Sequence, residues 1–374
     1  MKKKFYRFDY ILLFCVILLT IVGIVMVYSA SSYSATINYG DKYHFLKKQI
    51  VGSIIGIACL VFCMLINIEK TKKLKYVFLG VSVVLLAIVF IPGVGKTSYG
   101  ANRWINLGFA TIQPSEIAKF GFIFYSASVM SEMKQNPKTF KSMLPVLLAG
   151  CSICVLIILE PNMSITMCVG LVMLVMLFIG GSGIKNMILI TVPVLLLVPI
   201  LILIEPYRLQ RLSAFIDPWS SPLEEGFQLL QSYYALGSGS WFGVGFGNSR
   251  QKYLFLPFAE SDFIFSVIGE ELGFVFASLI LLVYILIIIR GFKIALNADT
   301  RYQCYLSSGI TALIGIQTLI NIAVVTGSIP PTGLPLPFIS AGSTSLIAFL
   351  SAIGILLNVD RQGRKCELNK MYAK

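Results

Sequence analysis

Ten long apolar segments divide this chain, and each is close to the length of a helix that crosses a membrane. A helical span needs about 20 mostly apolar residues, because the hydrocarbon layer of a bilayer is roughly 30 Å thick. Since 57% of the 374 residues are hydrophobic and only 13% are charged, a water-soluble fold would leave too much apolar surface exposed. We therefore expect an all-α polytopic membrane protein. The segments lie near residues 10–30, 48–66, 76–91, 113–131, 143–160, 163–181, 186–205, 263–290, 304–327 and 342–358.

The positive charges favour one orientation of these spans. An even number of spans puts both termini on the same side, which receives 20 of the 30 Lys and Arg residues against nine on the other. The positive-inside rule therefore predicts that both termini are cytoplasmic. The net charge of +13 follows from this bias and from attraction to anionic lipid, and it does not indicate a nucleic-acid partner.

The chain is expected to form a single integral-membrane domain over 1–374. It includes a large extracytoplasmic loop over 206–262, between the seventh and eighth spans, and a cytoplasmic tail over 359–374. All eight cysteines fall in helices or on the cytoplasmic side, so no extracellular disulfide framework is predicted. Cys151 and Cys154 form a C-x-x-C, but an apolar helix disfavours the thiolate that redox chemistry needs.

Three external loops have unusual compositions, and one of them, over 93–120, ends at the start of the fourth span. Within 206–262, the Leu and aromatic residues of 223–236 predict an amphipathic helix that lies at the membrane interface. The glycines from 237 to 247 allow tight turns or a close approach to a ligand, although a flexible loop explains them as well. The uncharged loop 327–345 carries four prolines, which predicts a packed extended or re-entrant segment, either a structural plug or a wall of a substrate site.

A charged pair is expected near the start of the fourth span. Pro114 suits the first helical turn and Glu116 lies near the positive end of the helix. Glu116 and Lys119 are three residues apart, so they share a helix face. Lys119 lies inside the apolar span, where a charge costs about 3 kcal/mol. Three alternatives stay open: a local Glu–Lys pair, a lysine that snorkels outward, and a cation that faces a polar cavity.

Asp262 is the acidic residue at the junction of the long loop and the eighth span. Ser261 and Asp262 precede a helix, where Ser and Asp are favoured as caps. Asp262, Ser266, Gly269 and Gly273 recur at helical spacing, however, and form a small polar stripe that could border a groove. Locally, Asp262 is as well explained by a helix cap as by a catalytic role.

Several long motifs, in order along nearly the whole chain, resemble those of the SEDS family (shape, elongation, division, sporulation), which contains FtsW, RodA and SpoVE. The GNSRQKY form is more similar to the FtsW/SpoVE branch than to the RodA branch. The motifs are GIVMVYSAS (23–31), NRWINLG (102–108), IQPSEIAKF (112–120), GNSRQKYLFLP (247–257), DFIFSVIGEELG (262–273) and TGLPLPFISAGSTS (332–345).

This resemblance implies the SEDS fold and a peptidoglycan glycosyltransferase that polymerises lipid II, in division or sporulation. It implies that Asp262, the membrane-edge aspartate of the DFIF motif, is essential. Family members usually work beside a class B penicillin-binding transpeptidase, so lipid II, the growing glycan-lipid, membrane lipid and such a transpeptidase are the expected partners. The expected substrate-binding residues are Trp104, Arg103, Lys119, Glu116, Gln113 and Ser340.

Glycan extension by such an enzyme joins the 4-hydroxyl of one sugar to the anomeric carbon of a lipid diphosphate-linked donor, with inversion. One general base suffices, and Asp262 can take the hydroxyl proton. The departing diphosphate needs positive charge, for which Lys119 and Arg103 are candidates, and a divalent cation (Mg²⁺ or Mn²⁺) is a further candidate. No Walker-type loop is present to bind a nucleotide.

Two positions depart from the family pattern. Asn162 stands where family members commonly have an aspartate, a plausible counter-ion for Lys119, and Glu160 could substitute for it. Phe258 stands where a glutamate is common, and Glu260 supplies an acid two residues later. The alternatives to a polymerase are a lipid II flippase and an inactive scaffold for the transpeptidase. The clustering of informative residues at the external end favours the enzyme.

Overall fold

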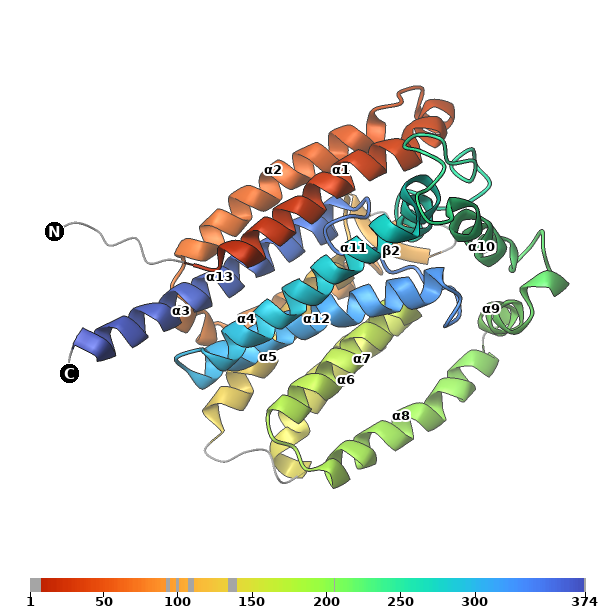
Figure 1. Ribbon diagram of the computed structural model, residues 1–374. Helices are drawn as coiled ribbons and strands as arrows, with labels where there is room; N and C mark the ends of the chain where they lie inside the picture. Colours follow the sequence, from red (N-terminus) through yellow and green to blue (C-terminus); the bar gives the residue numbers. More distant parts are fainter. Residues whose placement is uncertain are drawn as a thin grey trace.

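The computed structural model describes residues 8–91, 95–98, 101–106, 111–133, 140–204 and 206–372. Within these ranges, ten long helices match the ten predicted segments, and the all-α polytopic expectation is confirmed (Figure 1). They are α1 (Tyr10–Tyr39), α2 (His44–Leu65), α4 (Lys75–Ile88), α5 (Pro114–Glu132), α6 (Phe140–Leu159), α7 (Met163–Ile179), α8 (Ile184–Ile204), α11 (Ile264–Leu296), α12 (Arg301–Val325) and α13 (Ser343–Tyr372).

The composition of these helices suits a bilayer. In the described part of the chain, six are long and apolar enough to cross a membrane, and three shorter apolar helices accompany them. Large apolar side chains such as Phe14, Phe62 and Phe178 are more than 60% exposed on the outside of the bundle, where lipid rather than water would cover them. α5 differs because most of its residues are buried by its neighbours, which lets it carry Glu116 and Lys119.

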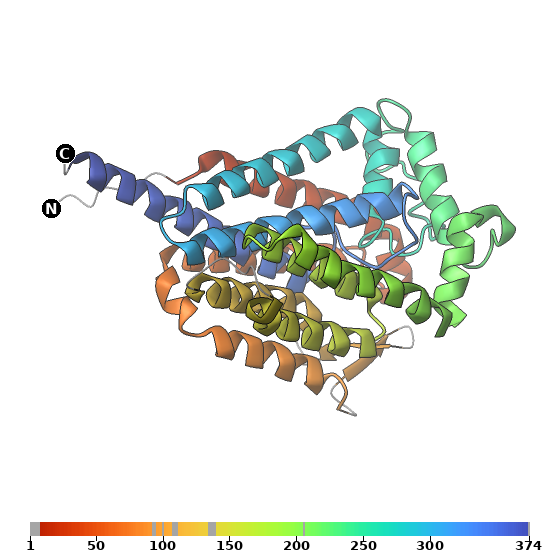
Figure 2. The same cartoon turned by 90° about the horizontal axis from the view of Figure 1, so that it is seen from below.

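The helices pack around one continuous apolar core. α2 runs along α13, α4 along α5, and α11 along α12, while α12 also contacts α5 and α7. The views in Figures 1 and 2 show these helices running roughly side by side, and Figure 1 shows α8 at one edge of the bundle. The apolar core therefore forms between the helices.

Both ends of the described chain lie at one end of the bundle, which we call the terminal end. Asp9 caps α1 and forms an ion pair with Arg290 of α11, and both line a cavity with Asp360 of α13. This arrangement follows from an even number of spans. α13 continues to Tyr372, well beyond its predicted end at 358.

The opposite end, which we call the loop end, holds the shorter elements. The region 206–262 contains α9 (Pro206–Ile216), the 3₁₀ turn η1 (Pro218–Ser220) and α10 (Phe227–Gly239). The helix predicted over 223–236 is thus present, shifted toward the C-terminus. Before α5, a small antiparallel sheet of β1 (Gly95–Ser98), β2 (Ala101–Asn106) and β3 (Thr111–Ile112) replaces the predicted loop. A short helix, α3 (Ile68–Lys72), precedes α4.

The helix that follows Asp262 is broken, although the sequence predicted a continuous span over 263–290. Gly273 has φ 78° and ψ 178° and interrupts α11. A Cβ at Gly273 would lie 2.3 Å from the backbone nitrogen of Gly243, so a side chain does not fit there. A break inside a membrane leaves N–H and C=O groups that must find partners within the protein.

The glycine-rich segment 240–247 supplies those partners. On one side of the break, the amide of Val244 donates to the carbonyl of Glu270 at 2.9 Å. On the other side, the amide of Phe274 donates to the carbonyl of Ser240, also at 2.9 Å. The segment is therefore a packed partner of α11, and the interpretation of its glycines as a flexible loop is wrong.

Of the small polar stripe, Ser266, Gly269 and Gly273 are buried within α11, so the interpretation of this part of the stripe as the border of a groove is wrong. The hydroxyls of Ser266 and Ser232 lie 2.8 Å apart in a hydrogen bond between α11 and α10. A Cβ added at Gly239 of α10 would lie only 1.9 Å from the carbonyl oxygen of Gly269. The small residues are there because α10 approaches α11 closely.

Candidate active site

Asp262 lies at the loop end, immediately before α11, and its side chain is partly exposed. The N-cap of α11 is Phe263, and no side chain in the described ranges caps the helix. The interpretation of Asp262 as a helix cap is therefore wrong. Gly333 faces the carboxylate, since a Cβ added there would lie 3.1 Å from Asp262 Oδ2. The absence of that side chain keeps room beside the carboxylate.

The proline-rich segment 326–342 holds the backbone around Asp262 in place. The side-chain nitrogen of Asn321 donates to the carbonyl of Asp262 at 2.8 Å and to that of Leu334 at 2.7 Å. The hydroxyl of Ser340 donates to the carbonyl of Ser261 at 2.6 Å. The predicted packed extended segment is confirmed, and Ser340 is a buried anchor within it.

Two arginines and a second acid set the electrostatics at Asp262. Burial, together with the charge of the neighbouring Glu260, raises the pKa of Asp262 to about 7. A hydrogen bond from Ser261 and the charges of Arg211 and Arg103 act in the opposite direction. The balance leaves a carboxyl group that exchanges its proton near neutral pH, which suits a general base. Arg211, on α9, was not identified from the sequence.

Arg103 reaches this region from β2. Its Nε donates to the carbonyl of Glu160 at 3.2 Å, and its guanidinium also donates to the carbonyl of Pro161. Glu160 is 1% exposed, and neither of its carboxylate oxygens has a hydrogen-bond partner among the described residues. Burial raises the pKa of Glu160 to about 8, although the charge of Arg103 lowers it. Trp104 follows Arg103 on β2 and is partly exposed.

Lys119 is buried and bonds two side chains inside the protein. Its ammonium lies 2.8 Å from Glu116 Oε1 and 2.6 Å from Gln317 Oε1, and the Lys119 and Glu116 side chains are each 1% exposed. Of the alternatives left by the sequence, the local Glu–Lys pair is the one present, and snorkelling is wrong. The suggestion that Glu160 is the counter-ion of Lys119 is also wrong, because Glu116 has that position.

A chain of contacts joins Lys119 to Asp262 through α12. Gln317 accepts from Lys119 and donates to the carbonyl of Pro335 at 2.8 Å. One turn further along α12, Asn321 bonds Leu334 and Asp262 as described above. Sequence reasoning missed Gln317 and Asn321. Their signal was two amides four residues apart in an apolar span, where polar side chains share a face and are costly unless partnered.

Gln113, one of the expected substrate-binding residues, lies at the start of α5. Gln113 is the N-cap residue of α5 and is partly exposed, and it makes no side-chain capping bond among the described residues.

In the described ranges, no three His, Cys, Asp or Glu side chains gather in a way that could hold a metal ion. Asp262 and Glu260 alone do not make up a divalent-cation site, so we derive no step through Mg²⁺ or Mn²⁺.

Together, these features define a polytopic membrane protein with a carboxylate-and-arginine site at one end of its bundle. The family model of FtsW, RodA and SpoVE, described as cell cycle protein, matches residues 9–365. The chain therefore belongs to this family, as the motifs indicated. It is 39% identical to stage V sporulation protein E of Bacillus subtilis (strain 168), over 95% of this chain and 98% of that protein. It is 38% identical to a probable peptidoglycan glycosyltransferase FtsW of Geobacter metallireducens, over 96% of each chain.

Solved structures support the fold. A chain of a peptidoglycan synthase complex, described as coordinating polymerization and crosslinking, matches with a TM-score of 0.79 and 28% identity, covering 96% of this chain and 98% of that one. The rod shape determining protein RodA of Thermus thermophilus matches with a TM-score of 0.71 and 26% identity, over 96% and 98% of the two chains. The likeness spans essentially the full length of both.

Proposed function

We propose that this protein is a peptidoglycan glycosyltransferase that polymerises lipid II into β-1,4 glycan, with Asp262 as its general base. The observation that carries the proposal is the partly exposed carboxylate of Asp262, which has a pKa near 7 and lies under the influence of Arg103 and Arg211. Family membership supports the reaction class, since the FtsW relatives are described as probable peptidoglycan glycosyltransferases.

The reaction that suits these residues is a single inverting displacement. The 4-hydroxyl oxygen of the acceptor sugar forms a bond to the anomeric carbon of the donor, while the bond from that carbon to the lipid diphosphate breaks. Asp262 accepts the hydroxyl proton as the new bond forms and later releases it to water. The electron pair of the broken bond leaves on the diphosphate, so atoms and charge balance without a nucleotide.

The positive charge for the diphosphate is assigned to Arg103 and Arg211. Both are close enough to lower the pKa of Asp262, and a guanidinium can donate two hydrogen bonds to a phosphate. Lys119 has a different role in this proposal, because its ammonium is already bonded to Glu116 and Gln317. It positions α12, and through Gln317 and Asn321 it supports the segment that holds Asp262.

The setting of the reaction is also proposed. The charge bias supports a cytoplasmic terminal end, so the loop end would face outward across the cytoplasmic membrane, with 206–262 extracytoplasmic and 359–374 cytoplasmic. The likeness to a chain of a peptidoglycan synthase complex supports a class B penicillin-binding transpeptidase as partner. The FtsW and sporulation relatives support a role in division or sporulation.

The test is polymerisation of lipid II by the purified protein, alone and with its transpeptidase. We expect wild type to produce glycan and Asp262→Ala and Asp262→Asn to lose at least about 100-fold in rate, since general-base catalysis contributes that much or more. Glu224→Gln, an exposed acid of the same loop, is the control and should match wild type. Equal glycan output from all variants would remove Asp262 as the base. Movement of lipid II across vesicles without lengthening would indicate a flippase instead.

A further inference from the structure

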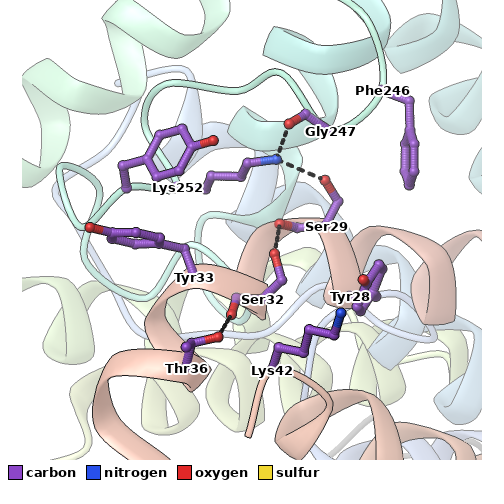
Figure 3. Close-up of a pocket in the computed structure, with 10 residues that line it drawn as sticks. Tyr28, Ser29, Ser32, Tyr33, Thr36, Lys42, Phe246, Gly247 and Lys252 are labelled. Carbon is purple, nitrogen blue, oxygen red and sulfur yellow. Dashed lines mark hydrogen bonds between the residues drawn. The ribbon is translucent and has the colours of Figure 1, made fainter. Parts of the chain in front are cut away.

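A second cavity, of about 400 Å³, opens at the loop end between α1 and the segment that precedes Asp262 (Figure 3). One wall is the last turns of α1, the rim includes Lys42 from the α1–α2 turn, and the other wall is the segment 246–253. Its volume is within the range of small-molecule sites, roughly 300–1,000 Å³. The cavity has no part in the proposed reaction. It is lined by Tyr28, Ser29, Ser32, Tyr33, Thr36, Lys42, Phe246, Gly247, Lys252 and Tyr253.

The floor of the cavity is a buried ion pair. Lys252 is 6% exposed, and its ammonium lies 3.1 Å from Glu271 Oε1 and 3.4 Å from the hydroxyl of Ser29. It also donates to the carbonyl of Gly247, as the dashed lines of Figure 3 show. An ammonium has three N–H donors, so all of them are used within the protein. Because Glu271 balances the charge, the floor is rigid and close to neutral, which argues against a site built for a strong anion.

The walls combine aromatic rings with hydroxyl groups. Tyr33, Phe246 and Tyr253 are each 40% or more exposed, and the rings of Tyr33 and Tyr253 meet edge to face with their centroids 4.8 Å apart. The hydroxyl of Thr36 donates to the carbonyl of Ser32, which leaves its oxygen lone pairs available as acceptors. Rigid aromatic faces beside hydrogen-bonding groups suit a ligand with both apolar C–H faces and many hydroxyls.

We propose that this cavity binds a short stretch of N-acetylated β-1,4 glycan, which is the strand that the enzyme makes. The cavity is separate from the residues that form the glycosidic bonds. The segment 247–262 carries Lys252 near one end and Asp262 at the other, so the cavity and the proposed reaction site are parts of one continuous loop. The inference rests on the proposed function. A glycan held there would stay with the protein between additions, and the product strands would be longer.

Interfacial aromatic residues have a simpler explanation, because Tyr and Trp are enriched where a bilayer meets water. This interfacial enrichment explains single aromatic rings on a convex surface. It does not explain four aromatic residues gathered around a concave, hydroxyl-lined cavity with an ion pair as its floor. A protein partner is the other candidate occupant, and it is treated as an outcome of the test.

The experiment measures binding separately from polymerisation. The probe is a soluble β-1,4-linked N-acetylglucosamine hexamer, added to full-length Asp262→Asn protein in detergent, with saturation transfer from tyrosine rings as the readout. We expect Tyr33→Ala and Tyr253→Ala each to weaken binding about tenfold. Tyr76→Ala, which removes a more exposed ring in the first turn of α4, is the control and should not change it. In the Asp262-intact background, the Tyr33 and Tyr253 variants should produce shorter glycan.

Other variants keep the test decisive. If the alanine variants unfold, Thr36→Tyr fills the cavity from its exposed rim without removing a packed ring, and it should also weaken hexamer binding. Any of three results would overturn the inference. These are unchanged hexamer affinity in Thr36→Tyr, displacement of the hexamer by inorganic pyrophosphate, and variants that lose transpeptidase binding but keep hexamer binding. Hexamer binding without any lipid II polymerisation by wild type would instead count against the proposed function.

Discussion

The side-chain nitrogen of Asn321 lies 2.8 Å from the backbone carbonyl oxygen of Asp262. The same nitrogen donates to the carbonyl of Leu334 at 2.7 Å. Both acceptors are carbonyls, so the nitrogen of the amide must face them. One residue of α12 thereby fixes the backbone of the proposed base relative to the proline-rich segment beside it.

Replacement of Asn321 by Ala should lower the polymerisation rate by about 100-fold, since a shift of about 1 Å at a reacting group costs that much. Stability should also fall, by about 1–3 kcal/mol, because two buried carbonyls lose their donor. Asn358 is a matched control, as its side-chain nitrogen bonds the carbonyls of Cys63 and Ile66, both at 2.8 Å, at the terminal end. Asn358→Ala should destabilise similarly and keep its rate. If Asn321→Ala and Asn358→Ala lower the melting temperature equally and also lower the rate equally, Asn321 has no positioning role.

The polymerisation rate should rise with pH through about 7, the pKa of Asp262. A base works only when deprotonated, so the rate at pH 6 should be about a tenth of its plateau above pH 8. Arg211→Gln removes a charge that lowers this pKa, and it should move the midpoint to higher pH. Initial rates measured between pH 5.5 and 8.5 check both statements. A flat profile for wild type would show that Asp262 does not titrate in the reaction.

Lys119→Met should destabilise the protein by about 3–5 kcal/mol, because it leaves Glu116 charged and buried without its partner. The double variant Lys119→Met, Glu116→Gln removes both charges and should recover most of that stability. We expect its polymerisation rate to stay low, since Gln317 loses the ammonium that orients it. Thermal unfolding and initial rates of the three proteins separate these effects. Full activity in the double variant would assign the pair to folding alone.

The close packing of α10 on α11 predicts opposite effects for two glycines of one helix. Gly239→Ala places a Cβ 1.9 Å from the carbonyl oxygen of Gly269 and should destabilise by about 1–3 kcal/mol. Gly237→Ala meets nothing within 4 Å and should be neutral or stabilising by up to about 1 kcal/mol. Thermal unfolding of both variants in detergent is the measurement. Similar melting temperatures would mean that α10 does not pack as closely as described.

Part of the site was predictable because family motifs single out Asp262, Arg103 and Lys119. Arg211, Gln317 and Asn321 were missed, since each is one polar residue whose importance depends on what lies opposite it. The role of Lys119 could not be chosen from the sequence, because a pair, a snorkelling chain and a cavity-facing cation have the same local pattern. The burial of Lys119 and its bonds to Glu116 and to Gln317 of another helix distinguish them.

The sequence by itself determined the number and order of the long apolar helices, because a bilayer demands about 20 apolar residues for each span. It also determined which loops would be unusual, through their glycines and prolines. The break at Gly273 was decided only by tertiary structure. Glycine is common in membrane helices, and a break there is stable only because the segment 240–247 meets the backbone groups that it leaves unpaired. The same applies to Asp262: its neighbours are far away in the chain, and their packing sets the proton affinity that makes it a candidate base.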